Sequence, residues 1–299
     1  MPDTGRARRS PGEAGFTLVE LVITAGVAAM ILTALYMLLE RNATLYTQGE
    51  AKADAQQGAR VVLEDMAANL RAAGNGVPRG TAPGTPEAVY ILYNGIAAGG
   101  EPLETSTTAV TFLGDIDGTA AELTSTVATG GLSVPIAPLQ RDYSKSLTGG
   151  ANTVVVSTQG AWAFGQYAGL AGNQSALTVA ALRTPSGAGA TFSPGSGVAA
   201  LEMVKYSLQG TNLVRRIGLF GGQVAAANPT VTWGAAETLL DNVVSLAFTY
   251  YDANNAVVAP PAAPGDSGTI RRVRITLRAH AGHGVPDYTF SFDVRLRTL

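Results

Sequence analysis

The chain of 299 residues contains no cysteine and only two histidines. The absence of cysteine excludes a disulfide framework and thiolate metal sites, and two histidines leave little material for histidine-based catalysis or metal binding. Charged residues make up only 14% of the chain, and the formal net charge of -2 gives no overall attraction to nucleic acid or acidic lipid. With 46% hydrophobic residues the chain can bury a sizeable core. Any electrostatic function must therefore come from local clusters of charge.

One long apolar run is present near the N-terminus. It extends from Phe16 to Leu39 and contains a single charged residue, Glu20. As a helix with a rise of about 1.5 Å per residue it would be roughly 36 Å long, which is enough to cross a hydrocarbon core of about 30 Å. Arginines concentrate before the run, so the positive-inside rule places the N-terminus in the cytoplasm. A Sec signal peptide would need a better cleavage site, and an ordinary signal anchor gives no reason for Glu20.

Glu20 requires a partner at membrane depth, because a carboxylate there costs roughly 2.5 to 3.5 kcal/mol or more. No basic residue of the apolar run can supply one. If the chain were cut after Gly15, Phe16 would gain a free α-amino group one helical turn from Glu20. In an assembly of parallel helices, the carboxylate of one copy could then pair with the amine of its neighbour. The residues therefore predict that cleavage after Gly15 creates the positive charge with which Glu20 of a neighbouring helix can pair.

The segment GFTLVEL at residues 15–21, preceded by a short basic leader, resembles the cleavage and methylation signal of type IV prepilins and of type II secretion pseudopilins. The resemblance implies cleavage between Gly15 and Phe16 by a membrane-embedded prepilin peptidase and N-methylation of Phe16. It also implies a role for Glu20 in the recruitment of the subunit.

An apolar periodicity continues beyond the membrane run. Its members, spaced three and four residues apart, are Ala59, Val62, Leu63, Met66 and Leu70. Such a stripe predicts an amphipathic helix that packs on a globular head and ends near Ala73, before the glycines and proline of residues 74–78. No proline occurs between Pro11 and Pro78, whereas major pilins of the resembled family usually have one in the membrane half. This departure favours a minor subunit or a pseudopilin.

Beyond residue 80 the pattern changes to short apolar segments between glycine-rich turns. We expect strands at residues 88–93, 108–114, 152–158 and 176–182. The intervening segments, such as residues 184–197, should be surface loops. We interpret this region as the variable half of a head, where binding specificity would reside.

Residues 200–299 alternate apolar and polar positions, as half-buried strands do. Residues 201–218 predict two strands around a turn, and residues 270–279 and 288–298 predict two more. In the strand between these pairs, the expected dry face consists of Val244, Leu246, Phe248 and Tyr250. The pattern predicts an antiparallel sheet with one wet and one dry face, and the dry face can cover the helical stripe.

The succession from VKYSLQGTNLVRRI through LLDNVVSLAFTYYDANN to IRRVRITLRA is similar to the C-terminal half of PilW-like minor pilins and J-type pseudopilins. Together with the N-terminal signal, the resemblance implies an α+β, type IV pilin-like fold in which a long N-terminal helix packs on a C-terminal antiparallel β-sheet head. The expected parts are a leader (1–15), a transmembrane half-helix (16–39), an amphipathic periplasmic half-helix (40–79), a variable Gly/Ala/Thr-rich β region (80–199) and the antiparallel sheet (200–299).

Several arginines are expected on one face of this sheet if its last two strands pair. They are Arg272, Arg274, Arg278, Arg295 and Arg297. Such a patch suits the phosphates of DNA, and DNA contact is a secondary hypothesis. The alternative is a solvated face whose arginine stems cover apolar surface and whose guanidinium groups meet acidic groups of adjacent subunits.

Other constellations match catalytic or metal-binding patterns only in part. The GDSG segment at residues 265–268 resembles a protease nucleophile turn, but His280 and His283 follow it in the chain, and no zinc-ligand spacing surrounds them. A weak calcium candidate consists of Asp115, Asp117 and Glu122. Thr119 stands where the full calcium loop would need a third Asp or Asn. No cofactor and no enzymatic activity are expected.

The sequence thus predicts a minor type IV pilin that acts in pilus initiation, at the tip or as a minor filament component. The precursor is expected in the bacterial inner membrane as a single-pass protein, and the mature subunit in a pilus at the cell surface. The partners that the resemblance implies are the prepilin peptidase, other major and minor pilins, the inner-membrane assembly platform and membrane lipid. A J-type pseudopilin of type II secretion is the alternative within the class, and a membrane-anchored adhesin or DNA-binding surface protein is the alternative outside it.

Overall fold

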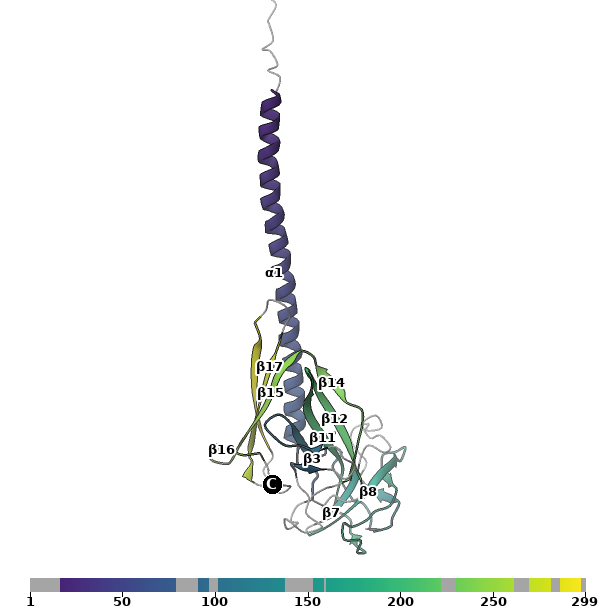
Figure 1. Cartoon of the computed structure of the whole chain (residues 1–299). Coiled ribbons are helices and arrows are strands. Elements are labelled where there is room, and N and C mark those ends of the chain that lie inside the picture. Colours follow the sequence, from purple (N-terminus) through teal and green to yellow (C-terminus); the bar gives the residue numbers. More distant parts are fainter. Residues whose placement is uncertain are drawn as a thin grey trace, which may run out of the picture. The chain divides into compact units, whose positions relative to one another are not determined.

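The computed structural model of the chain describes residues 17–78, 91–96, 102–137, 153–158, 160–221, 230–260, 269–280 and 286–296. The chain divides into two compact units, Met1–Lys52 and Ala53–Leu299. A single helix, α1 (Leu18–Ala72), contributes its first part to the first unit and its last part to the second (Figure 1).

The first unit consists, in its described part, of the N-terminal portion of α1. This portion is the one helical segment among the described residues that is long and apolar enough to cross a membrane, and none of it is buried within the protein. Large apolar side chains such as Leu18, Met30 and Leu39 are between 66 and 79% exposed. An exposed apolar surface of this extent is suited to lipid or to other apolar helices.

The last part of α1 has a buried stripe, which confirms the predicted amphipathic pattern. The buried residues are Ala59, Val62, Leu63, Met66, Ala67 and Leu70. The helix ends at Ala72, and Gly74 and Gly76 follow with φ values of 80° and 69°. These left-handed conformations suit glycine and reverse the chain direction at the end of the helix.

The larger sheet of the second unit is antiparallel throughout. In the described residues its path runs β13-β12-β11-β7-β8-β9-β6, with β3 and β4 paired to β11 and β14 paired to β12. The strands are β3 (Val110–Gly114), β4 (Ala121–Glu122), β6 (Ser133–Pro135), β7 (Thr153–Thr158), β8 (Ala161–Leu170), β9 (Ala176–Val179), β11 (Gly197–Gln209), β12 (Asn212–Gly221), β13 (Thr230–Trp233) and β14 (Glu237–Leu240).

β11 is the long strand that joins the two halves of this sheet. Its first residues pair with β7 and β4, and its later residues pair with β12 and β3. The predicted boundary between residues 199 and 200 falls within β11, so the Gly/Ala/Thr-rich region and the C-terminal region share this strand. The strands expected at 108–114, 152–158 and 176–182 correspond to β3, β7 and β9. Of the strand expected at 88–93, residues 88–90 lie outside the described residues, and Leu92 forms only an isolated bridge with Phe112.

The second sheet has the strand order β16-β15-β17-β18. Its strands are β15 (Val243–Tyr251), β16 (Val257–Val258), β17 (Arg272–Ala279) and β18 (Tyr288–Arg295). The predicted alternation is confirmed in β17, where Val273, Ile275 and Leu277 are fully buried. The prediction for Val244 is wrong: Val243 is buried and Val244 is 49% exposed, because the pairing with β17 shifts register between Val243 and Ser245.

The buried stripe of α1 lies in one apolar cluster with side chains of both sheets. The larger sheet contributes residues such as Phe112 and Tyr206, and the second sheet contributes residues such as Phe248 and Ile275. Figure 1 shows β15 and β17 on one side of this part of the helix and β11 and β12 on the other. Strands of residues 200–299 therefore cover the stripe, as expected, but they do not form the one predicted sheet. β11 and β12 belong to the larger sheet, on the opposite side of the helix from β15 and β17.

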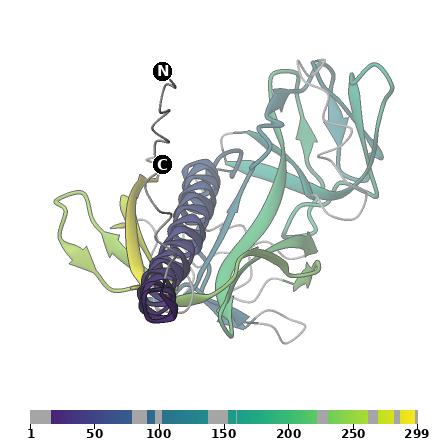
Figure 2. The same ribbon diagram turned by 90° about the horizontal axis from the view of Figure 1, so that it is seen from above.

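Two further apolar clusters form around β7, β8 and β11 (β7 and β8 are teal in Figure 2). Phe192, in the segment expected to be a surface loop, is fully buried in one of them. It belongs to β10 (Thr191–Phe192), which pairs with β5 (Val127–Ala128). A further pair consists of β1 (Gly95–Ile96) and β2 (Pro102–Leu103).

The turn after α1 should tolerate a side chain poorly. A Cβ at Gly76 would lie 2.4 Å from the Cβ of Ala199, whereas a Cβ at Gly118, which has the similar φ of +71°, would meet no atom within 4 Å. We expect Gly118→Ala to cost about 1 to 2 kcal/mol of stability from backbone strain alone. Gly76→Ala should cost roughly 1 to 3 kcal/mol more, because the helix end must also move away from β11. Thermal unfolding of the two variants measures the difference, and equal losses would contradict the close packing.

Candidate functional site

Glu20, in the first turn of α1, is hydrogen-bonded to Thr17 directly before the helix. The backbone N–H and the hydroxyl of Thr17 donate hydrogen bonds to Oε2 of Glu20, at 3.1 and 3.0 Å. In return, the backbone N–H of Glu20 donates to Oγ1 of Thr17 at 3.2 Å. This reciprocal arrangement is a capping box, which satisfies amide groups that have no partner within the helix. The carboxylate also lies at the positive end of the helix dipole.

The capping box gives Glu20 a partner within its own chain, whereas the sequence led us to expect only an external amine. The spacing Thr-x-x-Glu before an apolar run is the signal that would have revealed it. The second carboxylate oxygen, Oε1, accepts no hydrogen bond from the described part of the chain. Glu20 can therefore accept a further donor without losing its cap. Gly15 and Phe16 lie outside the described residues.

The wet face of the second sheet carries four of the five predicted arginines in register. Arg272 lies opposite Arg295, and Arg274 lies opposite Asp293. Asp293 bridges two of the arginines: its Oδ1 is 2.9 Å from Nε of Arg274, and its Oδ2 is 3.1 Å from Nη1 of Arg272. The hydrogen bonds from Arg274 hold the pKa of Asp293 below its ordinary value. Arg297 lies outside the described residues.

Arg278 is also paired, at the other end of β17. Its Nη2 is 2.8 Å from Oδ2 of Asp287, and Nδ1 of His280 is 2.8 Å from Oδ1 of the same carboxylate. The hydrogen bond with His280, and then the charge of Arg278, lower the pKa of Asp287. The arginine row therefore exists, but acidic residues interleave with it along most of its length. His280 forms a hydrogen bond with Asp287, while His283 and the GDSG segment at 265–268 lie outside the described residues.

The weak calcium candidate is not assembled in the structure. Among the described residues, no group of three or more acidic, histidine or cysteine side chains lies close enough to hold a metal ion. Asp115 is 1% exposed, and its Oδ1 accepts hydrogen bonds from the backbone N–H and the hydroxyl of Thr119 at 2.8 and 2.9 Å. Glu122, in contrast, is exposed on β4. Asp115 is buried and Glu122 is exposed, so the two carboxylates do not form the predicted calcium site.

Asp115 instead connects three parts of the second unit. Its backbone N–H donates to the carbonyl of Asn75, just beyond α1, at 2.9 Å. Thr119, which its carboxylate binds, accepts a hydrogen bond from the backbone N–H of Ala200 in β11 at 2.8 Å. Burial raises the pKa of Asp115, in opposition to the hydrogen bonds from Thr119. The acidic loop thus holds the helix end, β3 and β11 together.

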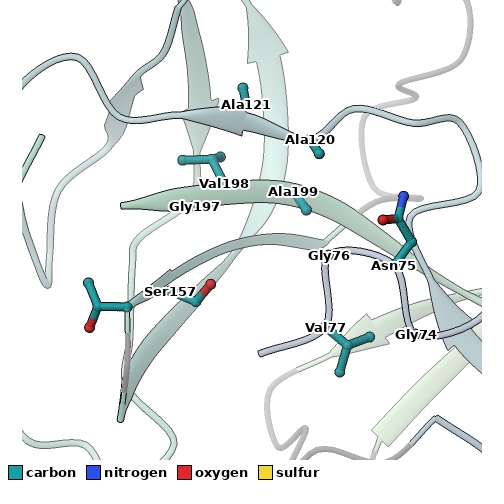
Figure 3. Close-up of a pocket in the computed structure, with 11 residues that line it drawn as sticks. Gly74, Asn75, Gly76, Val77, Ala120, Ala121, Ser157, Gly197, Val198 and Ala199 are labelled. Carbon is teal, nitrogen blue, oxygen red and sulfur yellow. The ribbon is translucent and has the colours of Figure 1, made fainter. Parts of the chain in front are cut away.

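A cavity of about 330 Å³ lies beside this junction (Figure 3). Its lining comes from the turn after α1, the start of β4 and the residue before it, the end of β7 and the start of β11. The lining residues are Gly74, Asn75, Gly76, Val77, Ala120, Ala121, Ser157, Thr158, Gly197, Val198 and Ala199. They are small or uncharged, so they offer hydrogen bonds but no group for acid–base chemistry.

Comparison of the chain with known protein families, with curated proteins and with solved structures gave no match.

The raised pKa of Asp115 predicts a pH dependence of stability. From its ordinary value of 3.8 upward, the unfolded chain releases this proton more readily than the folded one, so the contribution of Asp115 to stability falls as the pH rises. We expect Asp115→Asn to show a weaker fall in melting temperature between about pH 4 and pH 7. Asp115→Ala should lose about 1 to 3 kcal/mol at every pH, because Thr119 loses its acceptor. The same pH profile for the parent protein and Asp115→Asn would refute the assignment.

Proposed function

We propose that the chain is a minor type IV pilin, a non-enzymatic subunit that is made as a single-pass inner-membrane protein and then enters a pilus. The observation that carries the proposal is the position of Glu20. It follows the Gly15–Phe16 pair, caps the start of an exposed apolar helix, and retains one free carboxylate oxygen. The burial of the second half of the same helix in a β-rich unit supports the proposal.

In this proposal, the exposed half of α1 holds the precursor in the membrane until a prepilin peptidase cuts after Gly15. The new α-amino group of Phe16 is then N-methylated and stays positively charged. Oε1 of Glu20 in one subunit accepts a hydrogen bond from this group in a neighbouring major or minor pilin, while Oε2 remains in its own cap. At the assembly platform, the exposed half of α1 leaves the lipid and packs against the helices of other subunits. The β-rich unit is then carried to the cell surface.

The pseudopilin alternative has the same N-terminal chemistry and differs in the machine that uses it. Genomic neighbours discriminate the two, because a type II secretion operon and a pilus operon encode different partners. The alternative from another class is a membrane-anchored adhesin or DNA-binding surface protein that does not assemble. The ion pairs of Arg272, Arg274 and Arg278 with acidic residues disfavour DNA as its ligand.

Processing is tested directly by mass spectrometry of the protein from sheared filaments and from membranes. We expect the N-terminal peptide of the filament form to begin at an N-methylated Phe16, and the membrane pool to retain some uncut precursor. The matched control is Gly15→Val, which leaves the apolar helix intact but blocks a small-residue cleavage site. An uncut N-terminus in the mature parent protein would refute the proposal and support a simple membrane anchor.

The charge and the cap of Glu20 can be separated by two variants. Glu20→Gln keeps a side chain that can close a capping box but removes the negative charge, whereas Thr17→Ala removes the hydroxyl and keeps the charge. We expect Glu20→Gln to reduce incorporation into filaments by about tenfold or more, since a pair of buried opposite charges is lost. Thr17→Ala should change incorporation by less than about threefold, because a lost cap costs about 1 kcal/mol.

Immunoblots of sheared filaments and of membranes measure this comparison, and equal membrane levels show that both variants insert. If Glu20→Gln enters filaments as well as the parent protein, the charge does not recruit the subunit. If Thr17→Ala alone fails, Glu20 acts through the helix cap, and the pairing with a neighbour is wrong.

A further inference from the structure

A large cavity lies where the second sheet meets the last turn of α1. Its volume is about 700 Å³, and its lining consists of Arg71, Asn255, Arg272, Asp293 and Arg295. Arg71 lies in the last turn of the helix. Arg272, the first residue of β17, pairs with Arg295, the last residue of β18. Arginines from three separate elements therefore line one space, which we call the arginine pocket.

The positive charge of the arginine pocket is only partly compensated. Among the described residues of the lining, Asp293 is the one acidic residue, and it also pairs with Arg274 outside the lining. Neither Arg71 nor Arg295 has a carboxylate partner within the described part of the chain. In the described part of the lining, three guanidinium groups and one carboxylate thus leave a net charge of two positive units.

Two of the guanidinium groups are held in position by aromatic rings. The guanidinium carbon of Arg272 lies 3.8 Å from the centroid of the Tyr251 ring, and that of Arg71 lies 5.6 Å from the centroid of the Phe292 ring. The Nε atom of Arg272 is buried and has no hydrogen-bond acceptor among the residues that the structure describes. Stacked guanidinium groups lose little conformational freedom when they bind, and a buried donor without an acceptor favours a ligand that supplies one.

We propose that the arginine pocket binds a carboxylate of another protein, presented on an acidic segment that docks against the end of the second sheet. A carboxylate can accept two parallel hydrogen bonds from a guanidinium group. Its single negative charge reduces the excess positive charge of the lining and does not need to displace Asp293 from its arginine partners. The proposal concerns the second unit alone and does not depend on cleavage or on assembly into a filament.

The distribution of charge favours a protein carboxylate over DNA. DNA binding gains its strength from the contact of several successive phosphates with free cations. Along β17, however, Arg274 and Arg278 are already paired with Asp293 and Asp287. Among the described arginines of the sheet face, the one without a carboxylate partner, Arg295, lies in the pocket at the end of the sheet, which is suited to one anionic group and not to a row of them.

The test measures the binding of fluorescent probes to the full chain in non-ionic detergent micelles by fluorescence anisotropy. The probes are a short glutamate-rich peptide, a peptide of the same length with glutamine in place of glutamate, and a short DNA duplex. We expect the glutamate peptide to bind and the other two to bind at least about tenfold more weakly.

Arg295→Gln is the decisive variant, because Arg295 is exposed and makes no ion pair within the described residues. It should weaken binding of the glutamate peptide by about tenfold, and Arg71→Gln by a similar factor. Arg278→Gln is the matched control: it removes the same charge from the same sheet face but lies outside the pocket, so it should change binding by less than about twofold. Unchanged melting temperatures exclude a loss of folding.

Three outcomes would overturn the proposal. The first is equal binding of the glutamate and glutamine peptides, or no binding of either. The second is an equal effect of Arg278→Gln and Arg295→Gln, which would show a diffuse field and no pocket. The third is tighter binding of the DNA duplex that Arg295→Gln weakens, which would assign the pocket to phosphates.

Discussion

The second unit depends on the burial of one helical stripe between two sheets. Ala59, Met66, Ala67 and Leu70 are all fully buried, and the apolar cluster around them includes residues of both sheets. Each fully buried large side chain contributes roughly 1.5 to 3 kcal/mol, so the stripe is a major source of the stability of this unit. Without the helix, both sheets would expose their dry faces to water. The same helix that makes up the described part of the first unit thus completes the core of the second.

Polar contacts at the margin of the stripe fix the position of the helix along the larger sheet. Asn69 donates a hydrogen bond to the hydroxyl of Tyr206 at 2.7 Å, and Asp65 lies 3.2 Å from Arg215, which also pairs with Glu237. Burial raises the pKa of Tyr206 to about 12, so its hydroxyl keeps its proton at physiological pH. Apolar packing alone would tolerate a shift of the helix by one turn, whereas these directional contacts would be broken by it.

Sequence reasoning succeeded where a periodicity specifies one face, and failed where the answer depends on pairing. The stripe of α1 and the alternation of Val273, Ile275 and Leu277 are visible without any partner. β8 was missed because four successive residues, 162–165, are buried and one of them is Gly165, so this stretch shows no alternation. The bulge that buries Val243 in place of Val244 depends on the register with β17. The partial neutralisation of the arginine row also depends on strand pairing, since only the pairing of β17 with β18 places Asp293 between Arg272 and Arg274.

The cap on Glu20 changes the electrostatic argument for helix association. A carboxylate with two donors in its own chain is less costly in an apolar environment than one without, so the mere presence of an acid near the start of the run no longer requires an external amine. Glutamine could close the same cap without any charge, however, and would be less costly in lipid. The cap therefore explains the spacing from Thr17 to Glu20, while the retained charge and the free Oε1 are the features that a partner of opposite charge would explain. Oε2 accepts the hydrogen bonds of the cap and Oε1 remains available, so a single residue can cap the helix and still contact a neighbour.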